Sequence, residues 1–141
     1  MNRKTIVRVV GKVLIPFIAL FAFYTQFHGD YGPGGGFQAG VILASIFVLY
    51  GLLFGVDAVN QVVGPRALEV LAALGVLIFA GVGVLTLALG GNFLDYNVLD
   101  PHDPVHGQHL GVILIEAGVG ITVTSVMIAI FTAFASRGRE L

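Results

Sequence analysis

The sequence contains no cysteine, no tryptophan and few charged side chains. Without cysteine the chain can form no disulfide, hold no thiolate-bound metal and offer no thiol nucleophile. Only 11% of its 141 residues are charged, whereas a soluble domain averages about 25%. This is too little charge to cover a soluble globule. The net charge of −1 favours neither nucleic acid nor an acidic partner.

The sequence is instead rich in long apolar runs. Hydrophobic residues make up 57% of the chain, and its mean hydropathy is +0.96. A helix that crosses a bilayer needs about 20 mostly apolar residues, and four segments qualify, at about 9–27, 37–56, 68–89 and 110–134. We therefore predict an all-α, multi-pass protein of the cell membrane, with a single domain over residues 1–141 and a retained first span.

The basic residues predict the orientation of these spans. They lie before or early in the first span, between the second and third, and after the fourth: Arg3, Lys4, Arg8, Lys12, Arg66, Arg137 and Arg139. The connections 28–36 and 90–109 contain no lysine or arginine. Because cytoplasmic loops carry an excess of basic residues, we predict that both termini are cytoplasmic.

Glu116 is the one acid well inside a predicted span. A carboxylate near the bilayer centre costs about 2.5–3.5 kcal/mol on insertion scales, so such residues usually have a partner or a role. One interpretation is a proton- or cation-binding group in a cavity, and the other is a hydrogen-bonded residue that holds helices together. His109 lies seven residues earlier on nearly the same helix face. It could relay protons or simply lie at the membrane interface.

Lys12 is a second charged residue within an apolar run, one turn before Pro16. Proline removes a helical hydrogen bond, so a kink is expected there. Lys12 is a candidate for an ion path. The alternative is that its long side chain extends to the cytoplasmic surface.

A run of glycines precedes the second span: Gly32, Pro33, Gly34, Gly35 and Gly36, followed by Phe37. No strand precedes it and it lacks the Lys-Ser/Thr of a P-loop, so a nucleotide-binding loop is excluded. Glycine permits a tight turn, and the N–H groups at the start of the next helix suit a neighbouring backbone or an acid such as Asp30. The run therefore predicts a structural motif.

The connection 95–109 holds three aspartates and three histidines, which could bind a metal. Its prolines predict a non-helical segment, so we interpret it as an acidic outer loop without a metal site. Glycines also recur at four-residue spacing, as in Gly36 and Gly40, Gly51 and Gly55, and Gly107 and Gly111. Such spacing lets helices pack closely in lipid. It indicates a subunit of a larger membrane complex, or alternatively a glycine-rich monomer or homo-oligomer.

Two stretches resemble the MnhB/MrpB family, the B subunits of multisubunit sodium/proton antiporters. They are residues 28–40, with the glycine run, and residues 107–123, with Glu116. The resemblance implies an accessory subunit of a hetero-oligomeric complex that exchanges cytoplasmic sodium for external protons. It also implies a role in assembly and a contribution to an ion or proton path. Similar modules in membrane-bound hydrogenases and related respiratory complexes are an alternative host.

Three functional hypotheses follow. In the first, the chain is such a subunit and Glu116, then His109, binds the proton or cation. In the second, it is a structural scaffold whose glycines hold larger subunits together. The third, a small homodimeric exporter, fits poorly, because these carry the membrane glutamate in the first span and use tryptophan. The sequence shows no motif for bond-making chemistry and implies no cofactor.

Overall fold

The computed structural model describes residues 3–29 and 31–137, with the side chains of residues 3 and 4 left out. Its elements are α1 (Arg3–His28), α2 (Gly36–Phe54), α3 (Val56–Val62), α4 (Pro65–Ala88), the short 3₁₀ helix η1 (Tyr96–Leu99) and α5 (Pro104–Arg137). Over these residues the structure has no strand, and α1, α2, α4 and α5 are long and apolar enough to cross a membrane. The predicted fold class is therefore confirmed.

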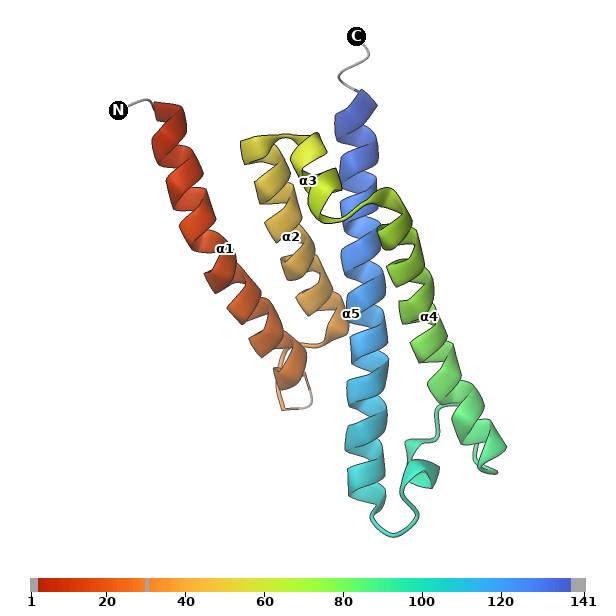
Figure 1. Ribbon diagram of the computed structural model, residues 1–141. Helices are drawn as coiled ribbons and strands as arrows, with labels where there is room; N and C mark the ends of the chain where they lie inside the picture. Colours follow the sequence, from red (N-terminus) through yellow and green to blue (C-terminus); the bar gives the residue numbers. More distant parts are fainter. Residues whose placement is uncertain (1–2, 30, 138–141) are drawn as a thin grey trace.

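Helix α5 is the centre of the bundle (Figure 1). It packs against α4 on one side and α2 on the other, and η1 packs against its N-terminal part. Helix α1 packs mainly on α2 and only slightly on α5. Helices α1 and α4 therefore form the two edges of the bundle, and much of their surface is left uncovered.

Close backbone contacts join α5 to both neighbours. On the α4 side, a Cβ added to Gly118 would lie 2.7 Å from the carbonyl oxygen of Gly75. On the α2 side, a Cβ added to Gly40 would lie 2.9 Å from the carbonyl oxygen of Gly120. These glycines therefore hold the chain's own helices together, as small residues do in membrane bundles.

The glycines at the predicted four-residue spacing have different structural roles. Gly36 and Gly40 do pack against α5. Gly55 instead ends α2 with φ of 95°, a turn conformation that suits glycine. Gly107 and Gly111 contact Tyr96 or its neighbours in the outer connection and not another spanning helix. Glycine spacing is thus an ambiguous signal, because turns and loops use glycine as well.

The start of α1, the start of α4 and the end of α5 lie at one end of the bundle (Figure 1). Arg8, Arg66 and Arg137 belong to these segments, which agrees with the predicted grouping of basic residues on one side. Arg139 lies outside the described residues. That this end is cytoplasmic stays a prediction.

Two helical stretches were not predicted from the sequence: α3 and the first turns of α5, residues 104–109. Helix α3 turns the chain between α2 and α4, and its Val59 joins Ala44, Leu68 and Ile128 in a buried apolar cluster. The prediction of a non-helical segment over residues 95–109 was wrong for residues 104–109, since α5 begins at Pro104. Asp103 accepts hydrogen bonds from the N–H groups of Val105 and His106, at 3.1 and 3.2 Å. A capping aspartate followed by proline starts a helix well.

Candidate functional site

The carboxylate of Glu116 lies against the glycine-rich connection between α1 and α2. A Cβ added to Gly29 would lie 2.7 Å from each of its two carboxylate oxygens, and one added to Gly35 would lie 2.8 Å from Oε1. The main chain of Glu116 also contacts Gly36, at the start of α2. The structure therefore joins the two features that the sequence presented separately, the acid within a span and the glycine run.

The connection can approach Glu116 because it has no side chains on that side. Gly35 has φ of 128°, which disfavours any residue other than glycine. Its N–H donates to the carbonyl oxygen of Thr25 at 3.1 Å. A Cβ on Gly34 would lie 2.6 Å from that same oxygen. Backbone geometry and lack of space both require glycine here.

The N-terminal end of α2 provides the electrostatic environment of this carboxylate. Gly35 precedes α2 and Gly36 begins it, and the first N–H groups of a helix have no partner within the helix and carry a partial positive charge. A carboxylate beside them is favoured. Glu116 is thus an acid at this helix start, while Asp30, which the sequence suggested for it, lies outside the described residues.

The two residues of the motif that are not glycine, Pro33 and Phe37, lie on its exposed side. Gly34, Gly35 and Gly36 are partly or fully buried, whereas Pro33 and Phe37 are exposed, and the side chain of Phe37 keeps 60% of its surface. Phe37 lies in the first turn of the spanning helix α2, so its ring faces lipid or a neighbouring protein. The motif therefore has an inner glycine part and an outer apolar part.

His109 lies near the same connection, closer to the N-terminal end of α5. Its ring centroid is 6.4 Å from that of Tyr31. Tyr31 is a residue of the connection between α1 and α2. Seven helical residues separate His109 from Glu116, which is about 10 Å along the axis. The structure thus places both predicted residues toward the 28–36 connection.

Lys12 is not part of this site. It lies in the other half of α1, exposed, with its Nζ 5.1 Å from the ring centroid of Phe54 at the end of α2. Arg8 contacts the same ring at 5.6 Å and donates to the carbonyl oxygen of Leu53 at 3.3 Å. Both cations therefore anchor α1 to the end of α2 by cation–π contacts.

The acidic connection between α4 and α5 forms a compact hydrogen-bonded turn. His106 Nδ1 lies 2.9 Å from Asp100 Oδ2, while Asp100 Oδ1 accepts from the N–H groups of His102 and Asp103, each at 3.2 Å. The hydrogen bond from His106, followed by those two N–H groups, lowers the pKa of Asp100 below its ordinary value. Among the described residues, no three histidine, aspartate or glutamate side chains gather in a way that could hold a metal ion.

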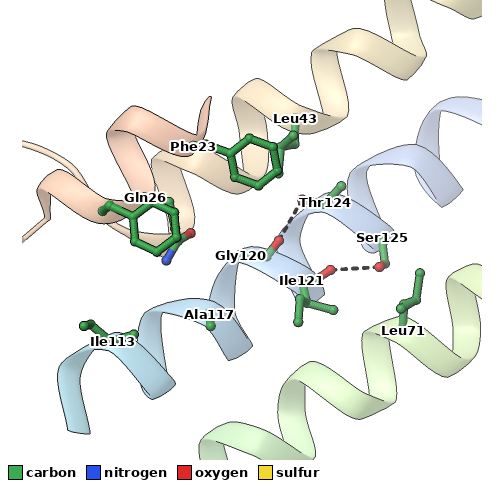
Figure 2. A pocket seen from close by; sticks show the side chains of 11 residues that line it. Phe23, Gln26, Leu43, Leu71, Ile113, Ala117, Gly120, Ile121, Thr124 and Ser125 are labelled. Carbon is green, nitrogen blue, oxygen red and sulfur yellow. Dashed lines mark hydrogen bonds between the residues drawn. The ribbon is translucent and has the colours of Figure 1, made fainter. Parts of the chain in front are cut away.

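Gln26 is a polar residue of this region that the sequence interpretation missed. Its Oε1 would lie 2.8 Å from a Cβ on Gly120, one turn beyond Glu116 on α5. It lines a cavity of about 350 Å³ together with residues of all four spanning helices (Figure 2). A lone glutamine near the end of the first apolar run was the available signal.

Fold and site together define a class: a multi-pass α-helical membrane protein in which a glycine loop packs on a carboxylate of the central helix. The family model described as "Domain related to MnhB subunit of Na+/H+ antiporter" matches residues 6–129, so the chain belongs to this family. The resemblance seen in the sequence is thereby confirmed, and the protein is a multi-pass protein of the plasma membrane.

Curated relatives agree with this assignment. The chain is 33% identical over 134 residues to a Staphylococcus haemolyticus protein named "Putative antiporter subunit mnhB2", and the match covers 94% of each chain. It is 30% identical over 141 residues to a Staphylococcus aureus (strain Newman) protein of the same name, with 99% of each chain covered. The chain therefore matches these relatives over their whole length.

Proposed function

We propose that this chain is an accessory membrane subunit of a multisubunit sodium/proton antiporter, and that Glu116 binds the proton or cation within it. The family and the relatives' printed names support the first part. The observation that carries the second part is the contact of Gly29 and Gly35 with the Glu116 carboxylate. The other subunits of the complex would be its partners, and sodium ions and protons the transported species.

The loop environment suits a carboxylate that changes its charge state. A carboxylate inside a membrane is stabilised when fixed dipoles face it, and the start of α2 supplies such dipoles. The residues that face the carboxylate, Gly29 and Gly35, have no side chains that would compete for it. His109, toward the outer end of α5, then passes protons between the outer surface and Glu116.

The test is antiport by the whole complex carrying Glu116→Gln, measured as sodium-induced proton movement in membrane vesicles. The variant keeps the size and hydrogen-bonding capacity of the side chain but cannot ionise. Antiport should fall about tenfold or more, the factor that corresponds to about 1.4 kcal/mol in binding. Assembly, measured by native electrophoresis, should be unchanged.

Glu69→Gln is the matched control, because Glu69 is an exposed acid in the first turns of α4. It should leave antiport near the native rate. If Glu116→Gln assembles and transports like the native protein, Glu116 has no ion-binding role. His109→Ala should slow transport less than Glu116→Gln does.

One observation favours the scaffold as a second candidate function. Glu116 touches both halves of the α1–α2 connection and therefore ties three helices together. A purely structural Glu116 would tolerate glutamine, which can still donate and accept hydrogen bonds, but not alanine. The glycines that this hypothesis assigned to partner subunits, Gly36, Gly40 and Gly118, pack inside the chain. Any surface for partners must therefore lie elsewhere.

A further inference from the structure

A cavity lined by Ala117, the residue after Glu116, lies in the surface of the bundle (Figure 2). It lies over α5, between α1 and α4, the two helices that make no extensive contact with each other. Most of its wall is apolar and includes Phe23 and Phe27 of α1, Leu43 of α2 and Leu71 of α4. With a volume of about 350 Å³, it is large enough for several side chains.

Gln26 contributes a polar amide group to the wall of this cavity. Among the described residues no hydrogen bond joins its side-chain amide to another group, and Gln26 is only partly buried, so the amide is accessible from the cavity. The two hydroxyls nearby are already used within α5: Thr124 donates to the carbonyl oxygen of Gly120 at 2.7 Å, and Ser125 to that of Ile121 at 2.8 Å. An amide in an apolar, water-poor setting is costly unless a partner supplies hydrogen bonds.

We propose that this cavity is the docking groove for one transmembrane helix of another subunit, which places a polar side chain against Gln26 and apolar side chains against the remaining wall. The proposal rests on the proposed function, since it requires a hetero-oligomeric complex. Polar side chains between apolar helix surfaces are a common means of fixing helix pairs in membranes.

Other occupants meet the requirements of the groove less well. A lipid acyl chain fills apolar space but cannot form a hydrogen bond with an amide. Water would satisfy Gln26 but not the apolar wall, and apolar cavities stay dry.

The groove would bring the partner helix close to Glu116. Ala117 lines the groove and follows Glu116 directly in sequence, and Gly120 lies one turn further along α5. A helix bound there would lie within about one helical turn of the carboxylate. The partner could therefore sense or complete the ion-binding site, which fits an accessory subunit that matters for transport as well as assembly.

Photo-crosslinking in the intact antiporter complex tests the proposal. The probe is p-benzoylphenylalanine at position 71, in the groove wall, with position 77 as the control. Leu77 is on the same helix and is 67% exposed, but it does not line the groove. After illumination, mass spectrometry should identify one spanning helix of a different subunit from position 71, at a yield at least tenfold higher than from position 77.

Gln26→Leu supplies the second arm. It should lower the position-71 crosslink at least fivefold, because the polar contact is lost, while Gln61→Leu, at an exposed glutamine of α3, should leave it unchanged. Crosslinks from position 71 to lipid alone, or to a second copy of this chain, would overturn the proposal. So would an equal yield at both positions, or no effect of Gln26→Leu.

These results are separable from those on the proposed function. If Glu116→Gln stops antiport but position 71 reaches only lipid, the docking groove is refuted and the ion-binding role stands. If position 71 reaches a partner helix while Glu116→Gln transports normally, the groove stands and Glu116 has a structural role.

Discussion

At the scale of single residues, the glycines of the 28–36 connection are as informative as the acid they face. A carboxylate can be brought to the start of a helix only if nothing fills the space between them. Gly29 and Gly35 leave that space open, and Gly35 adds a backbone conformation that other residues resist. The position of the Glu116 carboxylate therefore depends on the absence of Cβ atoms at Gly29 and Gly35.

Gly35→Ala should destabilise the protein by about 1–3 kcal/mol, the usual cost of a strained backbone conformation at a non-glycine residue. The new Cβ would also displace the Glu116 carboxylate, so antiport should fall in the fraction that still folds. Thermal unfolding of the purified protein in mild detergent measures the first effect, and vesicle assays the second.

Gly81→Ala is the control for that substitution. Gly81 is an exposed residue in the interior of α4, and a Cβ there would meet nothing within 4 Å. Alanine should raise stability by about 0.5–1 kcal/mol, because glycine is the poorer helix former. If both alanine variants behaved alike, the packing of Gly35 on Glu116 would not be important.

At the scale of elements, the connection from α4 to α5 is an ordered cap on the end of the bundle opposite the start of α1 and the end of α5 (Figure 1). The hydroxyl of Thr86, buried in α4, accepts from the N–H of Leu94 at 2.9 Å. Farther along, η1 packs on α5, where a Cβ on Gly107 would lie 2.7 Å from the carbonyl oxygen of Tyr96. Gln108 then donates to the side-chain oxygen of Asn97 at 2.9 Å.

Asp100 gives this connection a pH dependence. The pKa of Asp100 is lowered by the hydrogen bond to His106 and by the N–H groups of Asp103 and His102. Its stabilising effect is therefore fully present above the ordinary pKa of 3.8 and is lost as the pH falls through the lower folded pKa. The amide resonances of His102 and Asp103 should move in one transition below that ordinary value.

Asp100→Asn provides the comparison for this titration, measured by nuclear magnetic resonance in detergent micelles. Asparagine keeps one acceptor oxygen but never carries a charge, so the two amides should no longer titrate in that range. A transition centred above the ordinary pKa in the native protein would show that the hydrogen bonds to Asp100 do not favour its ionised form.

At the scale of the whole molecule, the bundle is open at its edges. The exposed apolar residues of α1 include Phe17, Leu20 and Phe27, each more than 60% exposed. Lipid can cover such a surface, so exposure by itself does not indicate a partner. The polar Gln26 in an apolar groove distinguishes that region from the rest of the surface.

The orientation of the bundle is a prediction at this scale, and the natural lack of cysteine makes it simple to test. Gln61→Cys, in α3, should react with a membrane-impermeant maleimide only after the cells are opened. His102→Cys, in the outer connection, should react in intact cells. Reversed labelling would place the basic end outside and contradict the positive-inside assignment.

The number and type of spanning elements could be predicted from the sequence, because a bilayer requires long apolar helices and leaves the backbone no alternative. Glu116 and the glycine run could also be singled out from the sequence, since an acid in a span and a cluster of glycines are both costly, and their functional role stays a prediction. Helix α3 and the early start of α5 were not, because short segments at the membrane surface obey weaker rules.

What the sequence by itself determined is the apolar composition, the four spans, the one-sided distribution of basic residues and the family. Only the tertiary structure decided that Gly29 and Gly35 meet Glu116, that Lys12 lies with Phe54 instead, and that Gln26 faces a groove. The physical reason is that the period of a helix tells which residues share a face, whereas helix packing decides what that face meets.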